Sequence, residues 1–554
     1  MEFRPDHHAE VPHLDLLSWL FADVEVDREK PIFIDTVDES QRLNIHQAVA
    51  LIRKLIAGLR TIGLKVGDAV CLHAFNHILY SSLYLGIVGA GGCVVGSNPA
   101  YASLELEHLL QTTNSKYIII ESDLLDKALP AILSADIPAS HIFVFSPGEC
   151  EDPPVGLRTW EYLLQHGEQD WIQFNNASIA KSTAAALLLT SGTTGLPKAA
   201  VISHYAHVAV GVSTEFLEKK KPYDVSYLLS IPQFHSFSVP FVHIAAFRPG
   251  RTIYIMRRFD PVRFAKYIHR YQITDTAVVP PMLASLVDSE DASRQLASLR
   301  VVYCAGSPLS PVLHRRILSV LHSDAVVTQV WGMTETGWIS TFCWPEKDVT
   351  GSVGRLVPNM EARVIDGHGN EALAEGVTGE IYVRGPTIMN GYLANPTATA
   401  DALQDGWLKT GDIGYFEGGK IYIVDRSKEL IKVRGWQVSP SELEATLLLH
   451  PAILDVAVVG VAMSDEYPGD QLPRAYVVVR PGQCLSERDV EEFVACRMAR
   501  YKALDGGVVF VTSIPRNGSG KILRRLLSEK MGAERIVAGT VSSMAADRAV
   551  EVGT

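Results

Sequence analysis

The chain has 554 residues, of which 47% are hydrophobic and 20% charged, and its formal net charge is −12 at pH 7. This length exceeds what one ordinary hydrophobic core supports, so at least two domains are expected. The acidic balance argues against a broad nucleic-acid-binding face, which needs clustered Lys and Arg, but it leaves room for one local basic site that holds a nucleotide.

The cysteines and the two ends of the chain bear on where in the cell the protein is expected to be found. Seven cysteines are spread along the sequence without a CxxC pair, so we expect buried thiols in a reducing environment. The N-terminal stretch MEFRPDHHAEVPHLD lacks the apolar segment of a signal peptide, and the final EVGT is not a peroxisomal address. The most apolar run, residues 79–95, is short for a membrane span and predicts a buried helix. A cytoplasmic location is therefore the expectation.

Between about residues 40 and 330, short apolar runs alternate with stretches of helical periodicity. The clearest helical stretch covers residues 46–63. Apolar strands that alternate with helices predict parallel sheets with helices on both faces. The predicted strands lie within residues 68–75, 116–122, 141–146, 186–191, 225–232, 252–256, 274–281 and 299–307.

After about residue 355 the strands become shorter, more polar and separated by glycine-rich turns, as in EARVIDG, TGEIYVRG and KIYIVD. This texture predicts a small antiparallel or barrel-like subdomain. An α+β segment follows, in which Ser439 with Pro440 behind it is a typical helix start. The expected fold is α/β: an N-terminal domain over 1–427, a small α+β C-terminal domain over 428–530, and a poorly ordered tail over 531–554.

The stretch TSGTTGLPK, from Thr190 to Lys198, directly follows an apolar run and therefore lies just after a predicted strand. Its glycines let the backbone approach an anion closely, its N–H and hydroxyl groups can donate, and Lys198 adds positive charge. It is not a Walker A loop, because that motif needs Gly-Lys-Ser/Thr after four free positions. We interpret it as a loop that binds phosphate.

Further motifs follow along the chain in a set order: IPQFHSF (231–237), YCAGSPL (303–309), QVWGMTETG (329–337), WLKTGD (407–412), DRSKELIK (425–432), RGWQ (434–437) and PRNGSGK (515–521). With these motifs the chain resembles the adenylate-forming enzymes, which include acyl- and aryl-CoA ligases, luciferases and peptide-synthetase adenylation domains. It is similar to the branch that contains 4-coumarate–CoA ligase. One departure is Ala199, since the family has glycine after the lysine of the phosphate loop.

The resemblance implies an ATP site assembled from most of these motifs. Trp331 is expected to stack on adenine, Thr334 to bond the α-phosphate, and Asp412 to accept bonds from the ribose hydroxyls. Glu335 is expected to hold Mg²⁺, a cation that prefers carboxylate and phosphate oxygens. The full implied ATP set is Thr190, Ser191, Gly192, Thr193, Thr194, Gly195, Lys198, Gln329, Trp331, Thr334, Asp412, Arg426, Lys428, Lys432, Gln437 and Lys521.

The resemblance further implies catalytic roles for Lys521, His235, Thr334 and Glu335. Lys521 would reach the α-phosphate and the attacking carboxylate, and the C-terminal domain would rotate about the hinge position Lys428 between two half-reactions. Coenzyme A is expected to pass Gly435, and Arg258 and Arg434 are the positional candidates for its nucleotide phosphates.

The implied acyl pocket is formed by Phe237, Phe241, Ser307, Val330, Trp338 and Ile339. Plant hydroxycinnamate ligases have glycine at the position of Val330, so the valine is expected to narrow or shorten the pocket. No cationic residue is evident among these positions, which favours a largely apolar acid.

The sequence therefore predicts ATP-dependent activation of a carboxylic acid to an acyl-adenylate, followed by transfer to coenzyme A. Three alternatives stay open at this point: transfer to the phosphopantetheine of a carrier protein, a luciferase-type oxygenase, and a non-catalytic scaffold of the same fold. The intact Thr334, Glu335, Asp412, Arg426 and Lys521 oppose the scaffold.

Overall fold

The computed structural model describes residues 1–22, 25–146, 156–190, 197–427, 429–433, 436–462, 471–517, 520–524 and 526–527, with only the backbone described at 436 and 437. The chain forms two compact units. The first comprises Met1–Thr410 and Tyr415–Tyr422, and the second comprises Gly411–Gly414 and the chain from Ile423 onward. The division proposed at 427/428 stays a prediction, and the expected tail lies outside the described residues.

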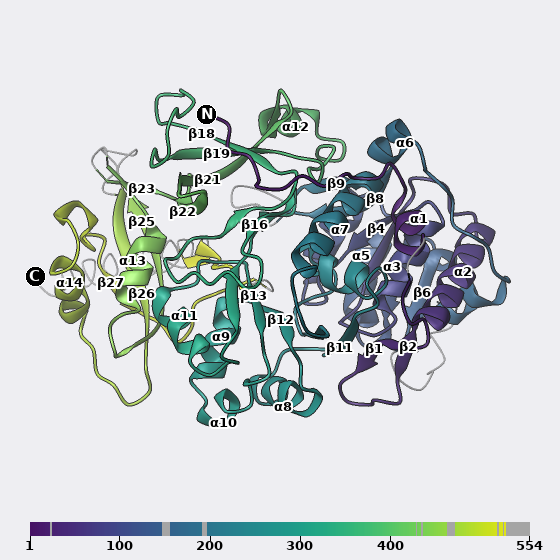
Figure 1. Ribbon diagram of the computed structural model, residues 1–554, viewed down its shortest axis with the longest axis horizontal. Coiled ribbons are helices and arrows are strands. Elements are labelled where there is room, and N and C mark those ends of the chain that lie inside the picture. Colours follow the sequence, from purple (N-terminus) through teal and green to yellow (C-terminus); the bar gives the residue numbers. More distant parts are fainter. Residues whose placement is uncertain are drawn as a thin grey trace, which may run out of the picture. The chain divides into compact units, whose positions relative to one another are not determined.

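The first unit contains a seven-stranded sheet with the order β7-β6-β5-β3-β4-β8-β9. Figure 1 labels β4, β6, β8 and β9 of this sheet. Its strands pair in parallel except for β9, which is antiparallel to β8. The strands are β3 (Ala69–His73), β4 (Cys93–Gly96), β5 (Tyr117–Glu121), β6 (Ile142–Phe145), β7 (Arg158–Thr159), β8 (Ala184–Leu189) and β9 (Ala199–Ser203). The expected strands at 68–75, 116–122, 141–146 and 186–191 are thus confirmed.

A second seven-stranded sheet has the order β14-β13-β12-β10-β11-β1-β2 and is parallel except for the edge strand β2. Its strands are β1 (Pro31–Asp35), β2 (Arg42–Asn44), β10 (Ser226–Leu229), β11 (Thr252–Ile255), β12 (Asp275–Val278), β13 (Val301–Cys304) and β14 (Val326–Gln329). These strands read as continuous apolar runs in the sequence because helices cover both faces of a parallel sheet.

Helices of the first unit pack on these sheets, except for α12, which contacts residues 403–404. They are α1 (Leu16–Phe21), α2 (Ile45–Thr61), α3 (Tyr80–Gly89), α4 (Ser103–Thr112), α5 (Leu125–Ser134), α6 (Ala177–Ser182), α7 (His204–Glu218), α8 (Pro261–Tyr271), α9 (Pro280–Val287), α10 (Glu290–Ser293), α11 (Pro311–Leu318) and α12 (Pro396–Ala402). Every residue of α3 is buried, which explains the apolar run at 79–95. At Gly86, the lack of a side chain lets α3 approach Leu55 of α2, where a Cβ atom would come within 2.7 Å.

Shorter strands complete the first unit and lead into the second. β15 (Trp331–Met333), β16 (Gly337–Thr341) and β17 (Arg355–Leu356) form one antiparallel sheet. A five-stranded sheet has the order β18-β19-β21-β20, with β22 paired to β21, and corresponds to the expected small subdomain. Its strands are β18 (Glu361–Ile365), β19 (Gly379–Arg384), β20 (Leu403–Gln404), β21 (Trp407–Glu417) and β22 (Lys420–Arg426).

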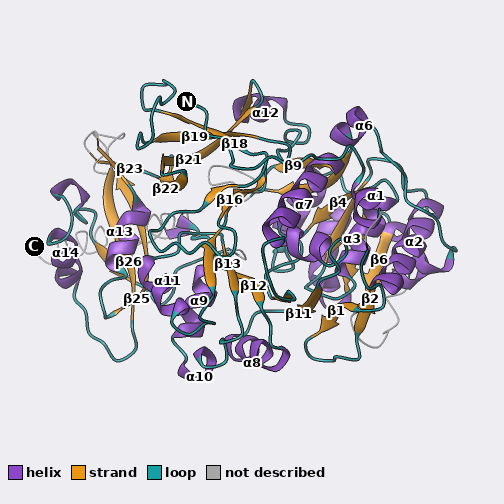
Figure 2. Cartoon of the chain, in the orientation of Figure 1, coloured by secondary structure: helices purple, strands orange, loops and turns teal. Residues whose placement is uncertain are grey.

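The second unit has its own core, in which α13 and α14 pack with the three-stranded sheet β25-β26-β27 (Figure 2). Its elements are β23 (Ile431–Val433), β24 (Trp436–Val438), α13 (Pro440–Leu447), β25 (Ile453–Ala462), β26 (Gln471–Val479), α14 (Glu487–Ala495) and β27 (Val508–Phe510). Ser439 caps α13 by accepting a bond from the Glu442 N–H, and Pro440 occupies the first helical position, as the sequence predicts.

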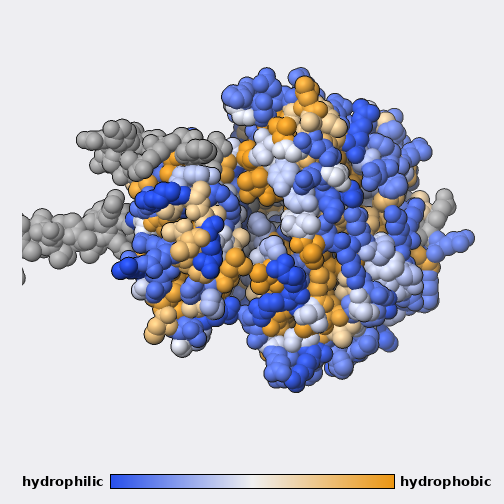
Figure 3. All heavy atoms as spheres, turned by 60° about the vertical axis from the view of Figure 1, so that its left-hand side comes forward, coloured by the Kyte–Doolittle hydropathy of each residue, from blue (hydrophilic) through white to orange (hydrophobic). Residues whose placement is uncertain are grey.

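In the view of Figure 3, the described part of the surface has no single large hydrophobic region, and the cysteines differ in their exposure. Hydrophilic and hydrophobic residues are interspersed over the face in Figure 3, and the most exposed large hydrophobic side chains belong to separate elements. Of the helices in the described residues, none is long and apolar enough to cross a membrane. The six described cysteines are free, but Cys484 and Cys496 are exposed, so the expectation of uniformly buried thiols was wrong.

Candidate functional site

The motif-bearing loops of the second sheet all begin where parallel strands end. IPQFHSF follows β10, YCAGSPL spans the end of β13, and the tryptophan-containing motif begins at the end of β14. Since these strands run in parallel, their carboxyl ends lie along one edge of the sheet, where α/β folds bind ligands. The fold thus gathers motifs that are about a hundred residues apart in the chain.

The phosphate loop lies between the antiparallel strands β8 and β9. Its base is closed by a bond of 2.8 Å from the Thr190 N–H to the Lys198 carbonyl. Ala199, the family departure, is the first residue of β9, is buried, and pairs with Leu189. The predicted donors Ser191, Gly192, Thr193, Thr194 and Gly195 lie outside the described residues, so their contacts stay a prediction.

Tyr392 connects the phosphate loop to Glu335. The ammonium group of Lys198 lies 4.9 Å from the centroid of the Tyr392 ring, and the Tyr392 hydroxyl donates a bond of 2.8 Å to Glu335 Oε1. Segment 390–393 is held beside β9, since the Leu393 N–H bonds the Ala199 carbonyl. Burial, with the nearby Glu335 charge, raises the pKa of Tyr392, which keeps its hydroxyl a donor. The sequence motifs gave no signal for Tyr392.

Glu335 follows Thr334 in the turn between β15 and β16. Glu335 is only 6% exposed, whereas Thr334 is half-buried. In the part of the chain that the structure describes, no group of three or more His, Cys, Asp or Glu could hold a metal ion. A site with one protein carboxylate is the arrangement expected where substrate phosphates supply the remaining ligands of Mg²⁺.

The side-chain amide of Gln329 is bonded within the protein. Its Oε1 accepts a bond of 2.9 Å from the Leu309 N–H, and its Nε2 donates to the carbonyls of Gly351 and Ser352 at 3.1 and 3.2 Å. Both Nε2 hydrogens are therefore used within the protein, and the side chain fixes the YCAGSPL loop. Trp331, on β15, is buried. Contacts of either residue with ATP stay predictions.

His235 is held in a well-bonded loop. Its Nδ1 accepts a bond of 3.1 Å from the Phe237 N–H, so the neutral ring carries its proton on Nε2. Burial lowers the pKa of His235 to about 4, which makes the ring neutral at pH 7. Two residues before it, the Gln233 carbonyl accepts a bond from the ring of His243. His235 is thus a fixed, neutral donor.

An aromatic cluster lies at the implied acyl pocket. The Phe241 ring lies 5.9 Å from Phe237, and 5.3 Å from both Trp338 and Tyr303, between ring centroids. Trp338 also lies 5.3 Å from Tyr303. These are favourable aromatic separations. Tyr303 was not among the predicted pocket residues.

The other predicted pocket positions are less closely tied to this cluster. Val330 is buried directly after β14, and Ser307 is half-buried in the loop after β13. Ile339 is fully buried but follows Trp338 on β16, and successive strand side chains point to opposite faces. Ile339 therefore lies on the face opposite to Trp338, and its predicted role in the pocket is not supported.

A buried lysine, Lys221, backs the aromatic cluster. Its Nζ lies 2.6 Å from Asp275 Oδ2, contacts the Glu218 carboxylate, and lies 3.3 Å from the Tyr303 hydroxyl. Arg251 adds a second cation, 3.6 Å from Glu218. Two carboxylates thus balance two cations. Burial acts to lower the pKa of Lys221, but Asp275 and its other partners outweigh burial and raise it well above the ordinary value.

This cation was missed because Lys221 belongs to the sequence EKKKPYD, which reads as a solvated charge run. Only the pairing of β10 with β12 brings Asp275 beside it.

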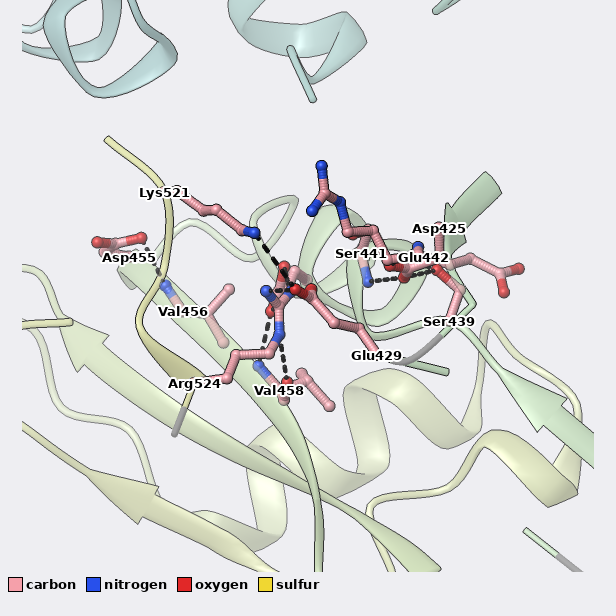
Figure 4. A network of polar contacts seen from close by, with 12 residues as sticks. Asp425, Glu429, Ser439, Ser441, Glu442, Asp455, Val456, Val458, Lys521 and Arg524 are labelled. Atoms are coloured by element: carbon pink, nitrogen blue, oxygen red, sulfur yellow. Dashed lines mark hydrogen bonds and ion pairs between the residues drawn. The ribbon is translucent and has the colours of Figure 1, made fainter. Parts of the chain in front are cut away.

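The second unit brings Lys521 near the predicted ribose site. Arg426 Nε lies 3.0 Å from Asp412 Oδ1. Burial lowers the pKa of Lys521 to about 8, Arg426 and Arg524 act in the same direction, and Glu429 and Asp412 oppose them. The two predicted ribose residues are thus close enough to Lys521 to influence its charge, although they come from distant parts of the sequence. Figure 4 shows the surroundings of Lys521.

The remaining predicted positions are scattered. Lys432 is exposed on β23. Lys428, Arg434, Gly435 and the side chain of Gln437 lie outside the described residues, so their roles stay predictions. Arg258 is exposed, and its guanidinium lies 3.8 Å from the centroid of the Phe75 ring. Stacking of this kind holds a cation in place while leaving its N–H groups available to an anion.

Comparison with protein-family models assigns both parts of the chain. The model of the AMP-binding enzyme matches residues 20–393, and the model of the AMP-binding enzyme C-terminal domain matches residues 442–521. The chain belongs to the AMP-binding enzyme family.

Curated relatives narrow the assignment to acyl-CoA ligases. The phenylacetyl-CoA ligase epaB of Aspergillus niger is 44% identical over 96% of this chain and 99% of its own length. The acyl-CoA ligase azaF of Aspergillus niger is 44% identical over 95% of this chain and 100% of its own length. The nicotinic acid-CoA ligase pyr1 of Aspergillus fumigatus is 35% identical over 94% and 97%.

Solved structures agree with this assignment. ATP-bound MatB from Rhodopseudomonas palustris has a TM-score of 0.81 and 25% identity, covering 93% of this chain and 98% of that one. This acyl-CoA ligase therefore uses ATP to activate a carboxylic acid and transfers the acyl group to coenzyme A, releasing AMP and pyrophosphate. Its large domain of parallel sheets and smaller α+β C-terminal domain are those of an adenylate-forming ligase.

Proposed function

We propose that this ligase activates a compact, uncharged aromatic or apolar carboxylic acid, with adenylation carried out by Lys198, Thr334, Glu335 and Lys521. A carboxylate is a poor acyl donor, because its leaving group would be oxide. Bonding it to the α-phosphate turns AMP into the leaving group. This step brings anions together and therefore needs fixed cations and donors.

Each of these tasks in the adenylation step can be assigned to a separate residue. Lys198, at the base of the phosphate loop, would hold the β- and γ-phosphates that depart as pyrophosphate. Thr334 would donate to the α-phosphate, and Lys521 would neutralise charge that builds up there. His235, a neutral ring with its proton on Nε2, would donate to the oxygen of the substrate carboxyl group.

Magnesium fits the environment of Glu335. The donor is a hard, buried carboxylate, and the Tyr392 hydroxyl fixes the position of its Oε1. Bound there with the phosphates, Mg²⁺ would supply charge neutralisation and a geometric template. Glu335 would hold the ion, and Tyr392 would orient Glu335.

The proposed size and charge of the acid rest on the aromatic cluster and on the buried ion pairs around Lys221 beside it. Phe237, Phe241, Tyr303 and Trp338 present ring surfaces, and the charge-balanced group around Lys221 leaves no net charge to attract an ionic tail. Val330 adds bulk at one side. Relatives whose names specify phenylacetyl and nicotinic acid substrates are consistent with a single-ring acid.

Coenzyme A would enter past Gly435, with Arg258 and Arg434 near its nucleotide phosphates. Arg258 supports this placement, since its guanidinium is exposed and stacked on Phe75. A carrier protein as the acyl acceptor is the alternative, and the assay below separates the two acceptors.

The test is a panel of carboxylic acids incubated with ATP and Mg²⁺, followed by pyrophosphate release with and without coenzyme A. We expect phenylacetate, benzoate and similar acids to react, and dicarboxylates and long fatty acids to fail. A Trp338→Ala variant is expected to gain activity with bulkier acids, because it removes the largest ring of the cluster. A wild-type preference for charged or long acids would contradict the proposal. Pyrophosphate release without thioester formation would favour the carrier protein.

A further inference from the structure

The segment that carries Lys521 is tightly anchored in the second unit. The Lys521 N–H bonds Asn517 Oδ1 at 2.9 Å, and the Asn517 N–H bonds the Lys521 carbonyl at 2.9 Å. Arg516 ties the same loop to Asp455 through a bond of 2.8 Å. The backbone of the lysine is therefore fixed, and its ammonium group is placed by the side chain alone.

Arg524 lies three residues after Lys521 and uses all of its side-chain nitrogen atoms as anchors. Its Nε donates to the Val458 carbonyl of β25 at 3.1 Å, and its Nη2 donates to both oxygens of Glu444 on α13 at 2.7 and 2.9 Å. Its Nη1 donates to Glu429 Oε2 at 2.9 Å. Figure 4 shows this guanidinium at the centre of the network. Arg524 thus connects a strand, a helix and the segment that follows the hinge position.

Glu429 is shared unequally between two cations. Arg524 holds its Oε2 in a true hydrogen bond, whereas Lys521 Nζ lies 3.8 Å from Oε1. That distance exceeds the range of an N–H···O bond, and within the described residues Lys521 Nζ is buried without a hydrogen-bond partner. A shift of about 1 Å would turn this long ion pair into a direct, charge-assisted hydrogen bond. The bond from Arg524 opposes this shift.

We propose that Arg524 is a positioning residue for adenylation: it keeps the Glu429 carboxylate out of hydrogen-bond range of Lys521, so that the donors of the ammonium group stay available to the substrate. This inference rests on the adenylation role proposed for Lys521. Glu429 remains close enough to favour the charged form of the lysine, yet it does not occupy the donors that the reaction needs.

The chemistry of the first half-reaction explains why the Lys521 ammonium group should not be hydrogen-bonded to Glu429. In the first half-reaction a carboxylate oxygen forms a bond to the α-phosphorus, and the bond from that phosphorus to the bridging oxygen breaks. Pyrophosphate departs with the electron pair, and no proton is transferred. Negative charge accumulates on the α-phosphate oxygens in the transition state. A lysine already bonded to Glu429 would have to break that bond first, and its charge would be partly cancelled.

The charged groups that influence Lys521 act in opposite directions. Arg426 and Arg524 lower the pKa of the lysine, and Glu429 and Asp412 raise it. Loss of Arg524 therefore predicts a higher lysine pKa, and loss of Glu429 a lower one. The decline of adenylation at high pH should shift upward in Arg524→Gln and downward in Glu429→Gln.

Two variants test the proposal. Arg524→Gln frees Glu429 to capture Lys521, so kcat/KM for pyrophosphate release should fall about ten-fold or more, as expected for a hydrogen bond to a charged group. The double variant Arg524→Gln/Glu429→Gln removes the capturing carboxylate and should recover to within about three-fold of wild type. Both variants lack the arginine that pairs with Glu444, so they differ only at residue 429. A recovery of adenylation in the double variant would therefore be due to the loss of the Glu429 carboxylate.

The second half-reaction and two further variants serve as controls. Thioester formation from a synthetic acyl-adenylate should change by less than about two-fold in both variants, because Lys521 is not needed there. Arg524→Lys, which keeps one cation, should retain intermediate activity. Arg488→Gln removes an arginine that pairs with Glu492 on the surface and should behave like wild type.

The outcomes separate this inference from the proposed function. A double variant as impaired in adenylation as Arg524→Gln, or equal loss of both half-reactions, would show that Arg524 has only a structural role. If Lys521→Ala retained adenylation, the proposed role of the lysine itself would be wrong. If Lys521→Ala lost adenylation and the double variant did not recover, only the positioning role of Arg524 would be refuted.

Discussion

Replacing Tyr392 by phenylalanine removes a single oxygen atom from the region between the phosphate loop and Glu335. The ring remains, so the contact of Lys198 with its face, at 4.9 Å, is retained. What is lost is the bond of 2.8 Å from the hydroxyl to Glu335 Oε1. The substitution therefore tests one proposal, that Tyr392 orients the carboxylate that holds Mg²⁺.

The size of the effect follows from the burial of the carboxylate. A hydrogen bond to a charged group contributes about 1.5–3 kcal/mol. Glu335 is only 6% exposed, so water has little access to replace the lost donor. At about 1.4 kcal/mol per factor of ten, kcat/KM for adenylation should fall roughly 10- to 150-fold.

The assay is pyrophosphate release at saturating acid, measured as a function of free Mg²⁺. In Tyr392→Phe the Mg²⁺ concentration for half-maximal rate should rise, because the ligand is no longer oriented, whereas thioester formation from a synthetic acyl-adenylate should not change. Tyr422→Phe is a matched control, since its hydroxyl pairs with the neutral Thr350 at 3.1 Å. An unchanged rate and unchanged Mg²⁺ dependence in Tyr392→Phe would refute the reasoning.

Three further predictions follow from other parts of the molecule. Because the pKa of Lys521 is lowered to about 8, its ammonium form is lost as the pH rises through that value, and kcat/KM for pyrophosphate release should decline above about pH 8; a profile that stays flat to high pH would contradict a role for the charged lysine. Lys221→Met leaves Glu218 and Asp275 buried without their central cation, so the free energy of unfolding should fall by about 3–5 kcal/mol in chemical denaturation; the exposed neighbour Lys220→Met should be near neutral, and equal stabilities would disprove the buried cluster. Ala199→Gly loosens the first residue of β9, so steady-state turnover should change; identical kinetics would dismiss a role for loop flexibility in pyrophosphate release.

Much of the fold could be predicted from the sequence, whereas the ATP contacts of the motif residues stay predictions. Strands such as β5 and β13 are continuous apolar runs because both faces of their sheets are covered, and that pattern is local. The motifs around Lys198, Glu335, Asp412 and Lys521 could be recognised for a similar reason, since each is a short loop whose chemistry needs fixed residue types at fixed spacing. Their order led to the family, which the comparisons confirmed.

The contacts of several other side chains could not be predicted from the sequence, because their partners are distant in the chain. Lys221 sits in a run of charges, and nothing local separates it from its solvated neighbours. Tyr392 lies in no recognised motif. Gln329 does lie in a motif, yet its amide is occupied by backbone groups of two other loops. Ile339 follows Trp338, a predicted pocket residue, but lies on the opposite face of the strand.

The sequence by itself determined the class of reaction, since the types and order of the chemical groups are written along the chain. Only the tertiary structure decided which charges are paired and which stay available. Asp275 neutralises Lys221 because β10 and β12 are neighbours in the sheet, and Arg524 holds Glu429 because its segment packs on α13 and β25. An ion pair depends on distance in space and on the exclusion of water, and neither quantity is encoded at a single position of the sequence.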